Sequence, residues 1–247
     1  MFEQYIERFL TRHDYKTVEP RAALIDMDGT LYDSMPRHAQ AWMRMVSEIG
    51  IHATPEEFFL YEGRTGASTI NLLFNREFGR NATEDEIKEL YHRKTVYFTE
   101  LPDVSPMPGA QKLMQELEAA GMKRVLVTGS GQSSLINRLD NDFPGAFPPD
   151  LRITGRDVVK GKPAPEPYLA AMKKAGVSPW QSIVIENAPL GVEAGDAAGA
   201  FTIGVTTGPL PGKALEDAGA AIVFADMPAL AARMPQLLSE LANVSND

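Results

Sequence analysis

The sequence predicts an α/β fold in which a mostly parallel, Rossmann-like sheet is interrupted by an inserted helical domain. Two observations lead to this fold class. First, short apolar runs alternate with amphipathic stretches, as expected when helices connect parallel strands; the runs are AALIDMD, KRVLVTGS, QSIVIENAP, AFTIGVTTG and AAIVFAD. Second, the long segment between the first and second runs carries helix signals and no strand signal.

The first elements along the chain are a leading segment and a strand. Residues 1–19 are amphipathic and charged, which predicts a peripheral helix rather than a signal peptide. The first apolar run ends in DMDGT, so that Asp26 and Asp28 stand between a strand and a glycine turn. Asp33 and Ser34, which follow, are expected to cap the next helix.

The inserted segment, residues 35–103, is predicted to form a helical cap domain. Thr54 with Glu57, and Thr83 with Glu86, match the Ser/Thr-x-x-Glu capping box. Apolar stripes mark two of the helices, one made by Trp42, Met45, Val46 and Ile49 and the other by Ile87, Leu90, Tyr91, Lys94 and Phe98. The exit of the segment, LPDVSPMPG, is rich in proline and suits a hinge.

The remaining residues, 1–34 and 104–247, are predicted to form the core around the sheet. The second, third and fourth apolar runs each follow a helix-like segment, for example AQKLMQELEAAG, in which Gly121 stands where a C-cap glycine is expected. Such connections between parallel strands are right-handed crossovers.

The composition restricts the function. The chain has 247 residues, a net charge of −9 and no cysteine. Its basic residues are scattered, which argues against nucleic acid as a partner, and no run approaches the roughly 20 apolar residues that span a membrane. Without thiolates, a metal has to be held by oxygen or imidazole, which favours Mg²⁺. We expect a cytoplasmic monomer that acts on a small molecule.

Polar residues follow the predicted strands and one loop. In a parallel sheet ligands bind beyond the carboxyl ends of the strands, so these residues are expected to converge. They are Asp26 and Asp28, then Thr128, Gly129 and Ser130, then Lys162 in GKPAPEPY, and finally Glu186 and Asn187. Residues i and i+2 of a strand share a face, so the two aspartates would repel each other unless a cation or a shared proton lay between them.

The chemistry of this set is that of phosphoryl transfer. One carboxylate can attack phosphorus, while a metal and a lysine neutralise the phosphoryl oxygens. A hydroxyl and backbone amides can hold the remaining oxygens, and the second aspartate can transfer protons. The set therefore predicts Mg²⁺-dependent chemistry on a small phosphorylated substrate.

The motifs DMDGT, VTGS, GKPAPEPY and VIENAPLGVEAG resemble, in this order, those of the haloacid dehalogenase superfamily. The resemblance implies that Asp26 is the nucleophile, that Asp28 is the general acid and base, and that Thr128 and Lys162 bind the phosphoryl group. It also implies that Mg²⁺ is ligated by the carboxylate of Asp26, the backbone carbonyl of Asp28 and the Glu186–Asn187 motif. The inserted helices resemble the mobile cap of the β-phosphoglucomutase-like subgroup, in which His38 and Trp42 match the first cap helix.

Two departures from that subgroup are visible. The cap loop reads YEGRTGAST, with Glu62 and Gly66 where the mutases have a basic residue and an arginine, and the fourth motif has Asn187 in place of aspartate. Losing one negative charge at the metal site is balanced if Glu62 reaches the metal from the cap. This pattern resembles members regarded as inorganic pyrophosphatases.

We therefore predict a phosphohydrolase acting through an aspartyl-phosphate on a small ester or anhydride such as inorganic pyrophosphate. The predicted substrate contacts are Thr128, Gly129, Ser130, Lys162, His38, Glu62 and Arg64. One alternative is a β-phosphoglucomutase that interconverts β-glucose 1-phosphate and glucose 6-phosphate, with Arg64 and Lys94 supplying positive charge. Another is a catalytically silent protein that binds a phosphorylated ligand. Lys94 is otherwise expected to face solvent.

Overall fold

The computed structural model describes residues 1–130 and 133–244. Within these residues, one six-stranded sheet has the order β3-β2-β1-β4-β5-β6, and all neighbouring strands are parallel. The strands are β1 (Ala22–Ile25), β2 (Lys123–Val127), β3 (Arg152–Ile153), β4 (Ser182–Glu186), β5 (Phe201–Val205) and β6 (Ile222–Phe224). All five apolar runs are strands, which confirms the predicted fold class. The short β3 was not predicted, because two residues show no periodicity.

The first strand lies at the centre of the sheet, between β2 and β4. Ile25 is level with Leu126 on one side and with Ile185 on the other. The chain order reverses at this position, which is where open α/β sheets bind ligands. The residues that follow β1, β2 and β4 therefore lie at one edge of the sheet.

Helices cover both faces of the sheet because the side chains of each strand alternate between them. On β1, Ala23 and Ile25 pack into a core cluster with α1 (Glu3–His13), α6 (Ala110–Ala119) and α12 (Met227–Asn243). Ala22 and Leu24 pack instead with α9 (Glu166–Ala175) and α10 (Pro189–Ala197). The shorter elements are α7 (Ser133–Ile136), α8 (Leu139–Asp142), α11 (Gly212–Asp217) and the 3-10 helices η1 (Pro149–Leu151) and η2 (Pro179–Gln181). Among the residues described, no helix is long and apolar enough to cross a membrane.

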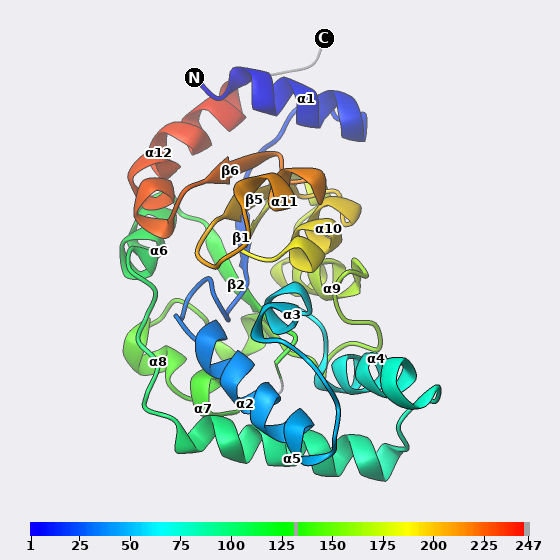
Figure 1. The fold of residues 1–247 in the computed structure, drawn as a ribbon. Helices are drawn as coiled ribbons and strands as arrows, with labels where there is room; N and C mark the ends of the chain where they lie inside the picture. Colours follow the sequence, from blue (N-terminus) through cyan, green and yellow to red (C-terminus); the bar gives the residue numbers. More distant parts are fainter. Residues whose placement is uncertain (131–132, 245–247) are drawn as a thin grey trace.

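Four of the five helices between β1 and β2 form a separate group with its own apolar cluster. They are α2 (Met35–Glu48), α3 (Pro55–Leu60), α4 (Gly66–Phe78) and α5 (Glu84–Glu100). Both predicted capping boxes are present, at Thr54 and at Thr83. Figure 1 shows this group at the end of the molecule opposite α1.

We propose that residues 35–103 form a cap domain on a core of residues 1–34 and 104–247. The division falls outside the helices, because α2 begins at Met35 and α5 ends at Glu100. Residues 131–132 and 245–247 of the proposed core lie outside the described residues.

Candidate active site

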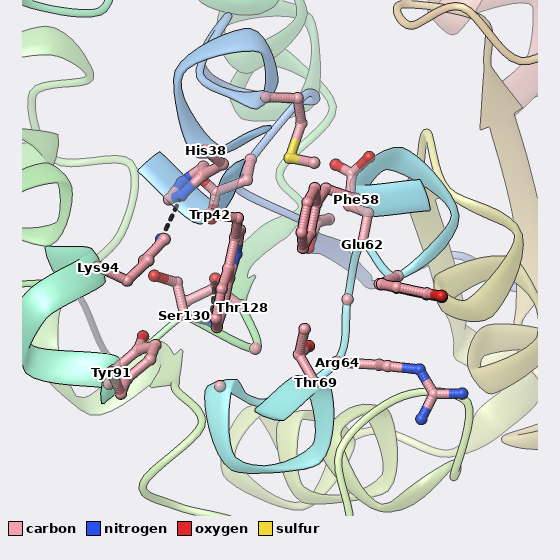
Figure 2. A pocket seen from close by; sticks show the side chains of 17 residues that line it. His38, Trp42, Phe58, Glu62, Arg64, Thr69, Tyr91, Lys94, Thr128 and Ser130 are labelled. Carbon is pink, nitrogen blue, oxygen red and sulfur yellow. Dashed lines mark hydrogen bonds and ion pairs between the residues drawn. The ribbon is translucent and has the colours of Figure 1, made fainter. Parts of the chain in front are cut away.

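The polar residues predicted to converge do meet at the sheet edge, and five of them line a cavity beside the helical insertion: Asp26, Asp28, Thr128, Gly129 and Ser130. Asp26 follows β1 and Thr128 follows β2, and both line the cavity. From the insertion, Glu62 and Lys94 also line the cavity, and Figure 2 shows them at opposite sides of the view with Thr128 between them. The strand order brings the core residues together, whereas the insertion residues arrive through the packing of α2–α5 over the sheet edge.

Lys162 lies in the loop before α9, and its ammonium group makes three hydrogen bonds to protein atoms. Its ammonium group donates to Asp26 Oδ1 at 2.5 Å, to Glu186 Oε1 at 2.6 Å and to the carbonyl of Val127 at 3.2 Å. An ammonium has three hydrogens, so these three bonds use every donor. Burial alone would lower the pKa of Lys162, but the two carboxylates raise it above its ordinary value. Lys162 therefore stays charged beside Asp26.

Asp26 keeps one carboxylate oxygen unbound by protein. Its Oδ2 is buried and has no hydrogen-bond partner, although Oδ1 accepts from Lys162. Burial, followed by the nearby charge of Glu186, raises the pKa of Asp26 well above its usual value, and Lys162 opposes this rise. A buried carboxylate oxygen without a partner costs free energy unless a ligand completes it. Oδ2 is thus the atom suited to meet phosphorus or a metal.

Asp28 belongs to a hydrogen-bonded chain that runs into the insertion. Its Oδ1 accepts from Ser34 Oγ at 2.7 Å and lies 2.9 Å from His38 Nε2, and His38 Nδ1 lies 2.6 Å from Lys94 Nζ. A charged lysine only donates, so His38 Nδ1 accepts and Nε2–H donates to Asp28. Burial raises the pKa of Asp28, but the contacts with His38 and Ser34 outweigh it and hold that pKa below its usual value.

Two predictions about residues of this hydrogen-bonded chain were wrong. Ser34 stands at the N-cap position of α2, but its hydroxyl makes no capping bond and goes to Asp28 instead. Lys94 does not face solvent: its exposed fraction is 2%, and its ammonium group lies over the rings of Trp42, Tyr91 and Phe98. The position of Lys94 within an apolar stripe was the sequence signal for this burial.

Lys94 should give the activity an alkaline limit. Burial lowers its pKa to about 8, so the positive charge facing the cavity is present below that pH and is lost as the pH rises through it. We expect kcat/KM to fall with an apparent pKa near 8. Because a hydrogen bond to a charged group contributes about 1.5–3 kcal/mol, Lys94→Met should lower kcat/KM roughly ten- to hundredfold at pH 7.

The control for this prediction is Lys94→Arg, which retains a charge that does not titrate in this range. Phosphate release measured between pH 5 and 10 should show the alkaline limb moving upward in this variant. If the alkaline limb of the kcat/KM profile stays at the same pH in both variants, the limb reports the ionisation of a group other than Lys94.

Glu62 reaches from the insertion to the core, whereas its role as a metal ligand stays a prediction. Its Oε1 accepts from Asn187 Nδ2 at 2.9 Å, and Asn187 Oδ1 accepts from Thr30 Oγ1 at 3.0 Å. Burial and then the negative charge of Asp26 raise the pKa of Glu62 well above its usual value, against the opposing bond from Asn187. Burial and nearby negative charge disfavour the ionised form of Glu62. We therefore expect its carboxylate to bind either a proton or a metal ion.

Glycines allow the loop around Glu62 to lie directly on the core. Gly29 has φ +77°, and a Cβ there would lie 2.1 Å from Asn187 Nδ2 and 2.8 Å from Glu62 Oε1. A Cβ on Gly129 would lie 2.5 Å from the carbonyl of Gly63. The insertion is therefore closed over the sheet edge in this structure.

The other predicted site residues take varied positions. Thr128, Gly129 and Ser130 line the cavity, and Thr128 Oγ1 accepts from the backbone N–H of Ser130 at 3.0 Å. Arg64 donates to Ser68 Oγ, and Figure 2 shows its side chain extending away from His38 and Lys94. His38 lines the cavity, but both its ring nitrogens bond to protein groups.

Glu186 has no free oxygen for a metal. Its Oε1 accepts from Lys162 and from the hydroxyl of Tyr168, each at 2.6 Å, and its Oε2 accepts from the backbone N–H groups of Asn187 and Ala188. We therefore propose that Glu186 orients Lys162. Tyr168, which the sequence reasoning missed, is the last residue of GKPAPEPY and is fully buried.

The residues fit Mg²⁺ only with help from other ligands. Within residues 1–130 and 133–244, no three His, Asp or Glu side chains are grouped so that they could hold a metal by themselves. Mg²⁺ commonly binds one or two carboxylates and completes its shell with water and substrate phosphate. Two carboxylates match this requirement: Asp26, whose Oδ2 has no hydrogen-bond partner, and Glu62, whose ionised form is disfavoured without a cation.

Comparison with known proteins identifies the class. Residues 20–199 match the model of the haloacid dehalogenase-like hydrolase family. The chain therefore belongs to this family, and it is an enzyme of the family's phosphatase and phosphotransferase type. The structure is also similar to that of a candidate beta-phosphoglucomutase from Bacteroides vulgatus, with a TM-score of 0.94, 46% identity and 98% of each chain covered. The chain thus falls in the β-phosphoglucomutase-like subgroup.

Characterised relatives include two phosphatases. Hexitol phosphatase A from Escherichia coli (strain K12) is 32% identical over 184 residues, which cover 74% of this chain and 81% of that protein. A phosphorylated carbohydrates phosphatase from Thermotoga maritima is 30% identical over 201 residues, covering 81% of this chain and 91% of that protein. Both names describe hydrolysis of phosphorylated carbohydrates by those proteins.

Proposed function

We propose that this chain is a Mg²⁺-dependent phosphohydrolase that acts through Asp26, with inorganic pyrophosphate as its first substrate. The observation that carries the proposal is the hydrogen bond between Glu62 of the insertion and Asn187 of the core. A carboxylate at this position repels the second phosphate of a sugar bisphosphate and supplies negative charge toward a metal. It thus favours a small substrate that binds the metal itself.

The first half-reaction uses Asp26 as nucleophile. A carboxylate oxygen of Asp26 attacks phosphorus, a P–O bond forms, and the P–O bond to the leaving group breaks. Lys162 balances the charge of Asp26 and of the phosphoryl group, while Thr128 is placed to bond a phosphoryl oxygen. Bound Mg²⁺ would supply further neutralisation of the phosphoryl oxygens. The product is an aspartyl-phosphate and a free leaving group.

The second half-reaction needs a base, and Asp28 is held ready as one. Ser34 and His38 stabilise its ionised form, so it can take a proton from the water that attacks the aspartyl-phosphate. A P–O bond to the water oxygen forms, the P–O bond to Asp26 breaks, and phosphate and the free Asp26 carboxylate result. The same contacts keep Asp28 deprotonated, so little of the protonated form is present to donate a proton in the first half-reaction. Phosphate is a good leaving group that needs little protonation, whereas an alkoxide needs much. The state of Asp28 therefore favours an anhydride over an alkyl phosphate.

A phosphorylated carbohydrate is the second candidate substrate, and the names of the relatives favour it. The mutase alternative draws on the Bacteroides vulgatus structure. A mutase has to bind a second phosphate in the cap, and here Arg64 is engaged with Ser68 while Glu62 occupies the cap loop. A silent binding protein would not require the intact set of Asp26, Asp28 and Lys162.

The test is a substrate panel with Mg²⁺. We expect phosphate release from pyrophosphate to exceed release from hexitol phosphates, glucose 6-phosphate and glycerol phosphate by at least about tenfold in kcat/KM. Interconversion of the two glucose phosphates without pyrophosphate hydrolysis would support the mutase. Hexitol phosphates as the preferred substrates would support the second candidate, and no turnover of any compound would support the binding protein.

A further inference from the structure

We propose that Tyr91, packed on Gly66, is the residue that limits the size of the leaving group. The proposal rests on the hydrolase activity inferred above and deepens it, because it concerns which phosphorylated compounds fit inside the cavity. It rests on the cavity's volume, on the rings that line it, and on one contact between α4 and α5.

The cavity is small and partly open to solvent. Its volume is about 60 Å³. A cavity needs roughly 10–15 Å³ to hold one water molecule, and pockets for drug-sized ligands measure roughly 300–1,000 Å³. A compact anion therefore fits between the lining residues, whereas a six-carbon sugar phosphate would have to extend out of the open side or displace a lining residue.

Aromatic rings form the wall of the cavity on the side of the insertion. We call this set the aromatic wall, and its members are Trp42, Phe58, Tyr61 and Tyr91. Trp42 stacks on Phe58 with 5.9 Å between ring centroids and 4° between planes, and Trp42 lies 6.3 Å from Tyr91. Trp42 comes from α2, Phe58 from α3 and Tyr91 from α5, as Figure 2 shows, and Tyr61 directly follows α3. Each ring contacts another of the set, so none can turn aside without disturbing a neighbour.

Tyr91 differs from the other rings in what lies behind it. A Cβ on Gly66 would lie 2.2 Å from both Cδ2 and Cε2 of Tyr91, so the ring rests directly on the backbone at the start of α4. Any larger residue at position 66 would have to displace the ring. Gly66 and Tyr91 thus work as a pair: the missing side chain makes room for the phenol ring that closes this side of the cavity.

Tyr91, like Tyr61, can be removed at less cost to the fold than Trp42 or Phe58. Trp42 and Phe58 are buried in the apolar cluster of the insertion, whereas Tyr91 is half-buried and packs at the edge of that cluster. Truncating Tyr91 should therefore enlarge the cavity and leave the central packing of the cap in place.

The test measures binding of two phosphonates that cannot be hydrolysed, ethylphosphonate and the 6-phosphonate analogue of glucose, with Mg²⁺. For the wild type we expect the dissociation constant of the large ligand to exceed that of the small one by at least tenfold. Tyr91→Ala should lower the constant for the large ligand tenfold or more and change that for the small ligand less than threefold. Tyr91→Phe, which retains the ring, should behave like the wild type.

The matched control is Tyr97→Ala, which removes a ring from the same helix outside the cavity lining. It should leave the ratio of the two constants unchanged. If Tyr91→Ala shows no cooperative thermal unfolding, Tyr91→Leu replaces it with the same expectation. Equal binding of both ligands by the wild type, or no gain for the large ligand in a folded truncation, overturns the proposal.

Turnover of pyrophosphate by the wild type is measured separately. Its absence would reject the proposed substrate while the ratio of the two dissociation constants still reports the size limit. Conversely, rapid pyrophosphate hydrolysis with an unchanged ratio in Tyr91→Ala would reject the role of Tyr91 and keep the proposed function.

Discussion

Asp26→Asn is expected to abolish turnover, with kcat lowered by about 10⁴-fold or more. The amide cannot act as the attacking carboxylate, so no aspartyl-phosphate forms. Lys162 would also lose the charge of one of its two carboxylate partners, although Glu186 remains bound to it. Phosphate release from pyrophosphate and from an aryl phosphate measures the effect, because the aryl phosphate makes few demands on the rest of the site.

The control for this variant is Asp33→Asn, the same chemical change in the loop that follows. Asp33 is exposed and does not line the cavity, so its variant should keep wild-type activity. Thermal unfolding should show that both proteins are folded. Turnover by Asp26→Asn within tenfold of the wild type would exclude Asp26 as the nucleophile.

Glu62→Gln is expected to lower kcat/KM for pyrophosphate roughly ten- to hundredfold, in the range seen when groups around a metal are changed. The glutamine oxygen can still accept from Asn187, so the contact between insertion and core is retained while the negative charge is lost. Glu62→Lys should cost more, because an ammonium in that place repels the metal. Titrating Mg²⁺ should show a raised apparent metal requirement in both variants.

The control here is Glu56→Gln, an exposed charge on α3 that does not line the cavity. It should change neither kcat/KM nor the Mg²⁺ requirement. If both Glu62 variants hydrolyse pyrophosphate as fast as the wild type, the role given to Glu62 and the substrate argument built on it are wrong.

A variant of Asn187 tests whether Glu62 and Asn187 act together. Asn187→Asp would place a carboxylate where an amide now donates to Glu62 at 2.9 Å, and two like charges at that distance cannot both remain ionised without a cation. We expect Asn187→Asp to be damaging in the wild-type background and less so together with Glu62→Gln. Additive effects in the double variant would mean that the two side chains do not act as a unit.

The fold could be predicted from the sequence because its signals are local. Each apolar run is a strand, and each capping box begins a helix, since hydrophobic alternation and cap chemistry act within a few residues. The strand β3 was not predicted because two residues are too few to show a hydrophobic pattern. The convergence of Asp26, Thr128 and Asn187 also followed, since the carboxyl ends of parallel strands share one edge.

The sequence by itself determined the class of protein and the sheet-edge residues, and the charge relation between Glu62 and Asn187 stays a prediction. The tertiary structure alone decided which atoms meet: that Lys94 is buried against His38, that Glu186 holds Lys162, and that Tyr91 rests on Gly66. The physical reason is distance along the chain. Periodicity shows which face a residue occupies, but a contact between α5 and α2, or between a loop and β4, depends on how separately formed elements pack.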